Sequence, residues 1–364
     1  MSRCDGGTFI RKDCRYPLSG QGRLCRMQCA VITGPVFDLH DCPGHPESAG
    51  RLHAILASLP AGIPLFHPEP VPEEALARVH LPGYLAWLRR LSPRGVEGLL
   101  PGWAPPPGVP AFIDADTYST PWSYGVARCA AGAACLAAGM AREGKSAFAL
   151  VRPPGHHALP AWAMGFCLIN NAAVAAAMAL DSADRIAIVD WDIHHGNGTE
   201  EIFKKSERVL YCSVHAEGLF PRSGEARETG SGAGAGYTVN APLLPGCSGG
   251  DVAHVITDLF IPVIRRFDPD LLIISAGQDA LADDPLSVMG LRPEDYGRLT
   301  RLLIDATGLS PAFILEGGYG RSHPAAVNAI LRAADGEQMQ QTVPPPLDTT
   351  RARVRLYRKI HGIG

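Results

Sequence analysis

The residues best suited to chemistry stand together at positions 190–200, which read Asp-Trp-Asp-Ile-His-His-Gly-Asn-Gly-Thr-Glu directly after the apolar run Arg185-Ile-Ala-Ile-Val189. Burying carboxylates and imidazoles where a strand ends is costly unless a cation binds them. Asp192 and His194 are two residues apart, so on an extended backbone their side chains share one face, and Asp190 falls on that face too. The cluster predicts a metal site at a strand end, with a hydrated loop as the alternative.

Further polar motifs follow other short apolar runs in the same way. The runs, each expected to be a strand, are Ala147–Val151, Arg185–Val189, Val209–Val214, Leu271–Ser275 and Ala312–Leu315. The motifs that follow them are Pro153-Pro-Gly-His156-His157, the Asp190 cluster, His215, Ala276-Gly-Gln-Asp279 and Glu316-Gly-Gly-Tyr319. Because ligands of open parallel sheets bind at the carboxyl ends of the strands, these motifs are expected to converge in space.

The segments between these strands have the composition of helices. They are Ser123–Arg142, Asn170–Leu180, Gly250–Phe267, Pro293–Thr307 and His323–Ala334. Strands that alternate with helices indicate a mostly parallel sheet covered on both faces. We expect one catalytic domain over residues 27–345, because no internal repeat is present.

The two ends of the chain differ from this body. Residues 1–26 are expected to be a disordered leader, or a stretch upstream of a start at Met27, although a small zinc knot of Cys4, Cys14, Cys25 and Cys29 is conceivable. Residues 346–364 form a basic tail or an edge element of the fold, which would touch acidic partners or simply be solvated.

Composition narrows the class of protein. Hydrophobic residues make up 46% of the 364 residues and charged ones 19%, so a large core can be buried. Residues 31–350 carry 22 Lys and Arg against 34 Asp and Glu. An acidic body is not typical of a nucleic-acid surface and weakly favours cationic ligands such as lysine-bearing peptides. No run of 18 apolar residues and no signal peptide is apparent, which predicts a cytoplasmic protein that does not span a membrane.

The converging motifs suit metal-assisted hydrolysis. Asp192 and His194 supply two ligands and Asp279 is the natural third, and three protein ligands with an open position describe a catalytic zinc site. Zinc would acidify water and polarise a carbonyl. His156 and His157 are adjacent, so one can transfer protons while the other supports it, unless the pair merely lies on a surface loop.

Aromatic and glycine residues complete the expected site. Tyr319 follows two glycines that permit close backbone approach, so its hydroxyl can reach a developing oxyanion. Phe166 and Phe220 line an apolar channel or pack in the core.

Taken together, the motifs resemble those of the zinc-dependent histone deacetylase superfamily. The similarity runs from about Met27 to Ala334, and Pro43-Gly-His-Pro-Glu47 fits the first loop of that family. The motifs that carry it are Pro154-Gly-His-His157, Gly165-Phe-Cys167, Asp190-Trp-Asp-Ile-His-His-Gly-Asn-Gly198, Ser275-Ala-Gly-Gln-Asp279 and Glu316-Gly-Gly-Tyr319. The resemblance implies a three-layer α/β/α arginase-like fold with a central, mainly parallel sheet of about eight strands.

The resemblance also implies a role for each matching residue. Zinc would be bound by Asp192, His194 and Asp279. His157, backed by Asn197, would act as general base and then acid, while His156 with its partner Asp190 gives electrostatic support. Tyr319 would polarise the amide carbonyl and hold the oxyanion. A structural potassium ion would be held by Asp190, Asp192, His194, Ser213 and the backbone of Val214. The acyl-lysine tunnel would be formed by Phe166, Phe220, Gly165, Leu286, Gly318 and Asp116, the last at its rim.

Departures from the family pattern refine this prediction. Asn197 stands where class I relatives have Asp, so the chain looks like a class II enzyme, and an amide partner would leave His157 a neutral base near pH 7. Tyr319 is not the His of the catalytically feeble subgroup. Leu286 replaces the carboxylate of polyamine-selective relatives. Gln278 and His195 have no assigned role.

Three alternatives remain beside hydrolysis of acetylated lysine in peptides or proteins. A binuclear manganese ureohydrolase needs a carboxylate two residues from Asp279, where Gly277 and Leu281 stand. A non-catalytic acyl-lysine binding module would be expected to lack Tyr319 or a metal ligand. A deacylase of longer acyl-lysines, or of a small acetylated amine such as an acetylpolyamine, would keep the same catalytic residues. Iron in place of zinc is a further alternative for the metal.

Overall fold

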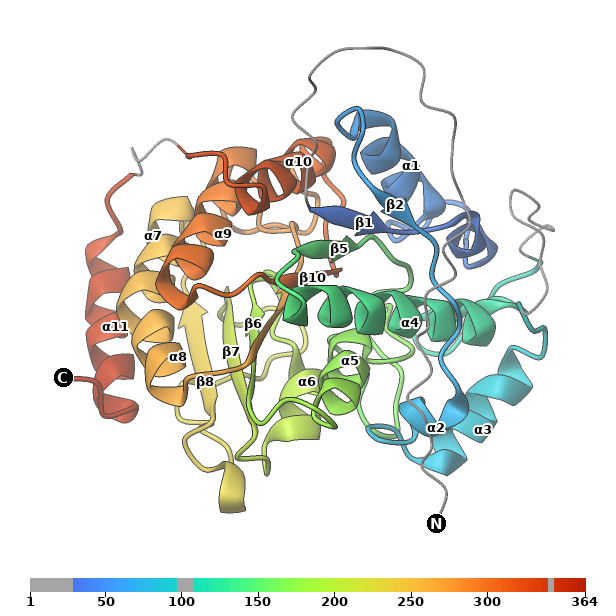
Figure 1. Cartoon of the computed structure of the whole chain (residues 1–364), viewed down its shortest axis with the longest axis horizontal. Helices are drawn as coiled ribbons and strands as arrows, with labels where there is room; N and C mark the ends of the chain where they lie inside the picture. Colours follow the sequence, from blue (N-terminus) through green and yellow to red (C-terminus); the bar gives the residue numbers. More distant parts are fainter. Residues whose placement is uncertain (1–28, 97–107, 340–343) are drawn as a thin grey trace.

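The structure, a computed structural model, describes residues 29–96, 108–339 and 344–364. Its centre is a sheet of eight strands in the order β2-β1-β5-β10-β9-β6-β7-β8, and every neighbouring pair is parallel (Figure 1). In that order the strands are β2 (Leu65–Phe66), β1 (Ala30–Ile32), β5 (Ala147–Ala149), β10 (Ala312–Leu315), β9 (Leu271–Ala276), β6 (Ile186–Asp190), β7 (Val209–Ala216) and β8 (Thr238–Leu243). A separate antiparallel pair joins β3 (Ala111–Phe112) and β4 (Tyr118–Ser119).

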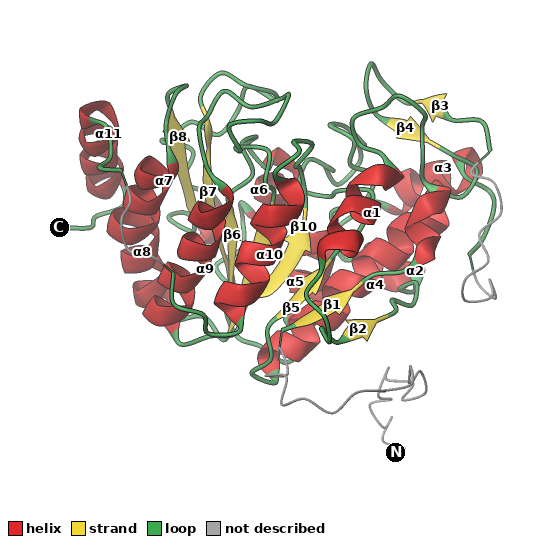
Figure 2. Ribbon diagram, turned by 90° about the horizontal axis from the view of Figure 1, so that it is seen from above, coloured by secondary structure: helices red, strands yellow, loops and turns green. Residues whose placement is uncertain are grey.

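Helices cover both faces of the sheet and make three layers (Figures 1 and 2). One face carries α4 (Ser123–Arg142), α5 (Asn171–Ala179) and α6 (Asn197–Phe203), with α2 (Glu73–Leu76) and α3 (Pro82–Leu91) beyond them. The other face carries α1 (Ala49–Ser58), α10 (His323–Ala334), α9 (Pro293–Thr307), α7 (Gly249–Val255) and α8 (Ile261–Phe267). This layering is the α/β/α architecture expected from the sequence.

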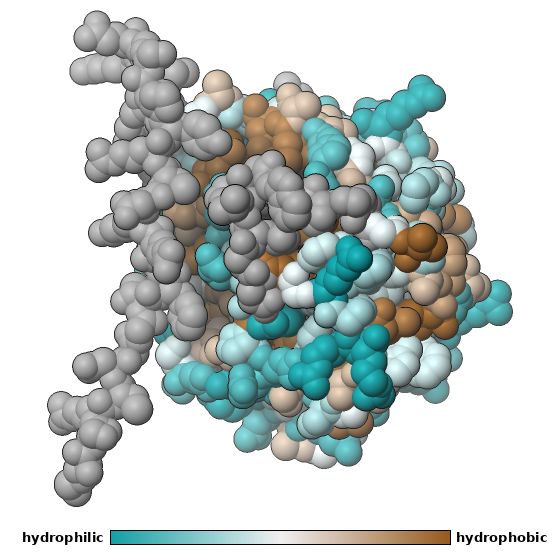
Figure 3. All heavy atoms as spheres, turned by 90° about the vertical axis from the view of Figure 1, so that its right-hand side faces the viewer, coloured by the Kyte–Doolittle hydropathy of each residue, from teal (hydrophilic) through white to brown (hydrophobic). Residues whose placement is uncertain are grey.

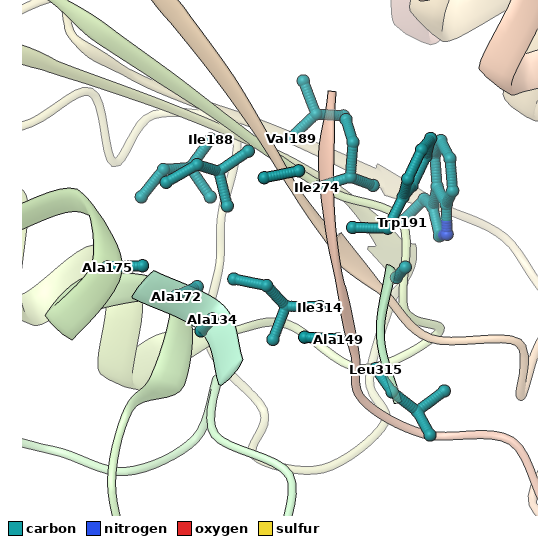
Figure 4. Close-up of a cluster of buried hydrophobic side chains, with 14 of the residues drawn as sticks. Ala134, Ala149, Ala172, Ala175, Ile188, Val189, Trp191, Ile274, Ile314 and Leu315 are labelled. Atoms are coloured by element: carbon teal, nitrogen blue, oxygen red, sulfur yellow. The ribbon is translucent and has the colours of Figure 1, made fainter. Parts of the chain in front are cut away.

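The core lies where the central strands meet α4 and α5. Ile188 of β6 and Ile314 of β10 face small alanines such as Ala134 and Ala172, while Ile274 of β9 lies on the other side of the sheet near Val189 and Trp191 (Figure 4). Small residues on these helices allow close packing against bulky strand residues. Each fully buried Ile or Val contributes roughly 1.5–3 kcal/mol relative to the exposed side chain. This rigid core fixes the strand ends that carry the polar motifs.

Helix α4 is long and apolar enough to meet a length-and-composition test for a membrane span, a feature not expected from the sequence. However, 67% of its apolar window is buried, and it packs against β5, β9, β10 and α5. This is the placement of a core helix. On the face at the right of Figure 1, apolar residues lie in separate patches among hydrophilic ones (Figure 3).

The observed elements differ from the expected ones chiefly in three respects, and the ends of β5, β7 and β9 are also shifted by one or two residues. Strand β6 ends one residue later, so Asp190 belongs to the strand. The single helix expected over residues 250–267 consists of α7, a π-helical turn η3 (Ile256–Phe260) and α8, and Pro262 at the start of α8 has no N–H to continue an α-helical ladder. Strands β1, β2 and β8 had no clear signal, because the first two have only three and two residues.

The basic C-terminal segment forms α11 (Asp348–Ile360), which lies beside β8 at the edge of the sheet (Figure 1). Val354 and Tyr357 are buried, and the Tyr357 hydroxyl donates to the carbonyl of Pro242 at 2.7 Å. At the other end of the chain, Cys4, Cys14 and Cys25 lie outside the described residues. Cys29 is buried next to β1, and burial raises the pKa of its thiol.

Candidate active site

The polar motifs meet at the carboxyl end of the sheet. Asp190, the last residue of β6, pairs in register with Ser213 on β7 and with Ser275 on β9, so these strand ends are level. The residues beyond them line a cavity of about 180 Å³. Its walls are Asp116, Pro154, His156, His157, Gly165, Phe166, Asp192, His194, Phe220, Asp279, Leu286, Gly317 and Tyr319.

Three of these residues form a compact set of metal-binding groups. The Nδ1 atom of His194 lies 3.1 Å from Asp192 Oδ1 and 2.9 Å from Asp279 Oδ2. Both carboxylates are wholly buried, and backbone N–H groups hold them: Ile193 donates to Asp279 at 2.8 Å and Gly317 to Asp192 at 2.8 Å. Two carboxylates and an imidazole, open to a cavity on one side, fit a zinc ion with a free coordination position.

The charges at this set favour a bound cation. Burial and the neighbouring Asp192 carboxylate raise the pKa of Asp279 to about 7. Burial lowers the pKa of His194, but Asp279 and Asp192 outweigh it and raise that pKa well above 6.5. Two buried carboxylates at this spacing are stabilised together only by positive charge, which a divalent ion supplies.

The tandem histidines occupy different electrostatic environments. His156 Nδ1 lies 3.1 Å from Asp190 Oδ2. Burial lowers the pKa of His156, but Asp192, Asp190 and Glu316 together raise it to about 10, so this ring is an imidazolium near neutral pH. Asp190 is fixed in turn by the Tyr211 hydroxyl at 3.1 Å.

His157 is the neutral member of the pair. Its Nδ1 lies 2.8 Å from Asn197 Oδ1, an acceptor, which places the proton on Nδ1 and leaves Nε2 as the basic nitrogen. Burial lowers the pKa of His157 well below 6.5, and the charges of His156 and His194 act in the same direction. Asp192 and the hydrogen bond with Asn197 act in the opposite direction and raise the pKa. The ring is therefore neutral, as expected, but burial and cationic neighbours, rather than the amide partner, are the main cause.

Tyr319, in the loop after β10, lines the same cavity as the two histidines. Burial raises the pKa of its hydroxyl well above 10, so the group remains a hydrogen-bond donor. The loop is held by Arg51, whose Nε donates to the Gly318 carbonyl at 2.7 Å and whose guanidinium lies 4.5 Å from the centre of the Tyr319 ring. The backbone N–H of Tyr319 donates to Asp284 Oδ2 at 2.5 Å.

Arg51 and Asp284 were not identified from the sequence. The available signal was Arg51 itself, an arginine beside Leu52 on the buried side of α1, since a charged residue on an apolar helix face needs buried partners. Asp284 has no comparable signal, because its partners are backbone N–H groups of a distant loop.

The aromatic residues expected at the tunnel flank the cavity. Phe220 is 40% exposed at its mouth, and its ring centre lies 5.0 Å from that of His157 at an interplanar angle of 84°. The ring centre of Phe166 lies 5.9 Å from that of Tyr319. Gly165 has a φ of 56°, and a Cβ there would lie 2.4 Å from the His157 ring. The site therefore requires glycine at this position.

The remaining tunnel residues are placed as follows. Leu286 and Asp116 line the cavity, and the carbonyl of Asp116 lies 2.9 Å from His45 Nε2. Gly317 lines the cavity, whereas Gly318 is absent from its walls and interacts with Arg51 instead.

Residues around the expected potassium site lie together, because Asp190 is the register partner of Ser213. The Ser213 hydroxyl lies 2.9 Å from His215 Nδ1. Potassium binding remains a prediction.

Two residues without an expected role have structural partners. His195 is buried with its ring nitrogens 2.8 Å from Ser223 Oγ and 2.9 Å from Glu200 Oε2. The side-chain oxygen of Gln278 lies 2.9 Å from His323 Nε2, so Gln278 supports the start of α10.

A binuclear metal site of the ureohydrolase kind does not fit here. A side chain at Gly277 would place its Cβ 2.0 Å from Asp192 Oδ2, and Leu281 is buried in the core. Among the described residues one further group of potential ligands exists, His156, Cys167 and Glu316, but its imidazole is already held by Asp190.

Comparison with known proteins agrees with this geometry. The histone deacetylase domain matches residues 45–334. Histone deacetylase 15 of Arabidopsis thaliana is 39% identical over 317 residues, which cover 82% of this chain and 54% of the relative, so the chain spans about half the length of that protein. A histone deacetylase-like amidohydrolase of Pseudomonas aeruginosa is 37% identical over 80% of this chain and 76% of the relative. A probable deacetylase of Methanothermobacter thermautotrophicus is 36% identical over 87% and 93%.

A solved structure extends the likeness to three dimensions. The crystal structure of the HDA15 HD domain superposes with a TM-score of 0.82 at 35% identity, covering 92% of this chain and 94% of that chain. Together with the all-parallel eight-stranded sheet and flanking helices of this chain, the likeness confirms the arginase-like fold expected from the sequence. The motifs, the fold and the relatives agree, and the chain belongs to the histone deacetylase superfamily.

Proposed function

We propose that this protein is a zinc-dependent deacetylase that hydrolyses the amide of acetylated lysine side chains in peptides or proteins and releases acetate. The observation that carries the proposal is the meeting of a three-ligand metal set, a neutral histidine and a tyrosine hydroxyl donor on one aromatic-flanked cavity. In the reaction a water oxygen bonds to the acetyl carbon and the bond to the lysine nitrogen breaks.

Zinc would be held by Asp192, His194 and Asp279, and when bound it supplies Lewis acidity that acidifies water and polarises the amide carbonyl. The chain's own residues perform the proton transfers. His157, neutral because of burial and its cationic neighbours, accepts the proton of water on Nε2 and returns it to the lysine nitrogen as the amide bond breaks.

His156 and Tyr319 complete the proposed chemistry. His156 stays an imidazolium against Asp190 and stabilises negative charge that develops beside it. Tyr319 donates its hydroxyl to the oxyanion, and its high pKa suits a group that must keep its proton.

The cavity walls favour an acyl-lysine over an acetylpolyamine. The aromatic rings of Phe166 and Phe220 flank an apolar aliphatic chain, while Leu286 offers no anion for a distal ammonium. Potassium would bind at the expected position beside Asp190 and Ser213 and would help to hold the zinc ligands in place.

A side-by-side assay tests the substrate. Zinc-loaded protein is given acetyl-lysine peptides, longer acyl-lysine peptides and acetylpolyamines, and the free amine is quantified. The highest kcat/KM is expected on the acetyl-lysine peptides. Preference for a longer acyl chain or an acetylpolyamine would contradict the proposed substrate, and tight binding with no turnover of any of them would indicate a binding module.

A further inference from the structure

Glu316 is a buried carboxylate to which the proposed reaction assigns no proton transfer and no contact with substrate. Its charge contributes to the raised pKa of His156, but Asp192 and Asp190 are the larger causes and remain when Glu316 is replaced. It directly follows β10, and its Oε2 accepts hydrogen bonds from the backbone N–H groups of Gly155 at 2.7 Å and His156 at 3.1 Å. Gly155 and His156 belong to the loop after β5, the strand that pairs with β10. The side chain thus joins the ends of two neighbouring strands.

The loop that Glu316 holds is fixed on its opposite side as well. Asn171, at the start of α5, donates to the carbonyl of Pro153 at 3.1 Å. A Cβ at Gly155 would lie 2.5 Å from the backbone nitrogen of Asn171, so the loop is packed tightly against the helix. The tandem histidines are therefore carried by a segment clamped between α5 and Glu316. Loss of either clamp leaves buried N–H or C=O groups without a partner, and the segment must move to satisfy them.

The backbone around Glu316 connects this clamp to the other reacting groups. Its carbonyl accepts from Arg51 Nη2 at 2.6 Å, and the next residue, Gly317, donates to Asp192 Oδ2 at 2.8 Å. The same short segment continues to Tyr319. One residue thus sets the distance between the histidine loop, a metal ligand and the oxyanion donor.

We propose that Glu316 is a positioning residue that fixes His156 and His157 relative to Asp192 and Tyr319 through the oxygen that accepts the Gly155 and His156 N–H groups. This inference rests on the proposed function, because it assigns Glu316 a part in that reaction. The second carboxylate oxygen, Oε1, has no hydrogen-bond partner among the described residues. An amide nitrogen can replace Oε1 without displacing the bonds to Oε2, which makes glutamine the conservative substitute.

Two variants separate the acceptor from the charge and the volume. Glu316→Gln keeps an acceptor oxygen and loses the charge, while Glu316→Met loses both at similar volume. A displacement of about 1 Å in a reacting group costs roughly 10²-fold. We expect kcat of Glu316→Met on an acetyl-lysine peptide to fall 10- to 100-fold with KM nearly unchanged, and Glu316→Gln to stay within about threefold of wild type. An unchanged kcat in Glu316→Met, or an equal loss in both variants, would overturn the assignment.

Asp251 supplies a matched control. This buried carboxylate also accepts two backbone N–H groups, those of Ser248 and Leu347, both at 2.8 Å, but it lies in α7 and does not line the cavity. Asp251→Ala is expected to lower thermal stability without changing kcat. A loss of kcat in Asp251→Ala as large as that in Glu316→Met would show a general effect of buried acceptors and refute a positioning role.

Hydrogen exchange distinguishes failure of this inference from failure of the proposed function. The amides of Gly155 and His156 are expected to exchange faster in Glu316→Met than in wild type, with Glu316→Gln close to wild type, whether or not the wild-type protein turns over acetyl-lysine. Unchanged protection of both amides in Glu316→Met would overturn the clamp itself.

Discussion

The buried carboxylate of Glu47 provides a quantitative test of how the site is held. Its Oε1 accepts from Arg152 Nε at 2.6 Å and from Arg51 Nη1 at 3.1 Å, and its Oε2 accepts from Arg152 Nη2 at 2.9 Å. Arg152 precedes the loop of the tandem histidines, and Arg51 holds the loop of Tyr319. Glu47 thus lies between the supports of both halves of the site.

The expected size of its effect follows from its pKa. Burial raises the pKa of Glu47, but Arg152 and Arg51 outweigh it and hold the value at about 2, against 4.5 for the free group. A carboxyl perturbed to this extent stabilises the fold by roughly 3 kcal/mol at neutral pH. Removing one partner of a buried ion pair typically costs about 3–5 kcal/mol. Asp41 lies 3.6 Å from Arg152 and remains as a partial partner, which favours the lower end of that range.

We therefore expect Glu47→Gln to lower the free energy of unfolding by about 3 kcal/mol at pH 7. Because the folded-state pKa is depressed, the stabilisation is fully present above pH 4.5 and is lost as the pH falls toward 2. The difference between wild type and variant is expected to shrink to less than half at pH 3. Urea unfolding at both pH values measures this difference in the free energy of unfolding. Metal-free protein is used, because release of metal in acid would otherwise contribute to the pH dependence.

An exposed ion pair serves as the control. Glu73 lies 3.3 Å from Arg89 with its side chain 42% exposed, so Glu73→Gln is expected to cost no more than about 1 kcal/mol. Equal stability of Glu47→Gln and wild type at pH 7, or a difference that does not change with pH, would refute the reasoning.

Three further predictions concern residues of the candidate active site. Tyr319→Phe removes one oxyanion donor and is expected to lower kcat roughly 10²-fold or more, with little change in KM, in steady-state assays on an acetyl-lysine peptide; an unchanged kcat would contradict its role. Gly165→Ala places a Cβ 2.4 Å from the His157 ring at an unfavourable positive φ, so kcat/KM is expected to fall. In the control Gly139→Ala, in α4, the added Cβ has no neighbour within 4 Å, and activity is expected to be retained. Equal activity of the two variants would contradict the requirement for glycine at position 165. Asp190→Asn weakens the support of the metal set and is expected to reduce zinc affinity about 10- to 100-fold in chelator competition, and unchanged affinity would exclude that support.

Much of the site could be predicted because its residues belong to recognisable local sequence patterns. Asp192 and His194 stand two residues apart after an apolar run, and Asp279 and Tyr319 follow similar runs, so the rule that ligands bind at carboxyl strand ends brings them together. The layers could also be predicted, because the apolar strands and the alanine-rich α4 are recognisable from their local sequence.

The parts that escaped prediction depend on partners distant in sequence. Arg51 and Glu47 acquire their roles only when α1 packs beside the loop after β10, and Glu316 only when β10 lies next to β5. β1 and β2 are too short for a periodic pattern, and they are defined by parallel pairing of β1 with β5 and of β2 with β1. The low pKa of His157 likewise depends on burial and on the charges of the adjacent His156 and of His194 from another loop.

The central claim, a metal-dependent deacetylase, is tested most directly by acetate release before and after metal exchange. The protein is freed of metal by chelation, divided, and assayed on an acetyl-lysine peptide with no addition, with zinc, and with iron(II). We predict that acetate appears in equal amount to free lysine amine in the zinc-loaded sample, is absent from the metal-free sample, and returns in proportion to bound zinc up to one ion per chain. Acetate release that survives complete metal removal, or none at full zinc occupancy, would contradict the account.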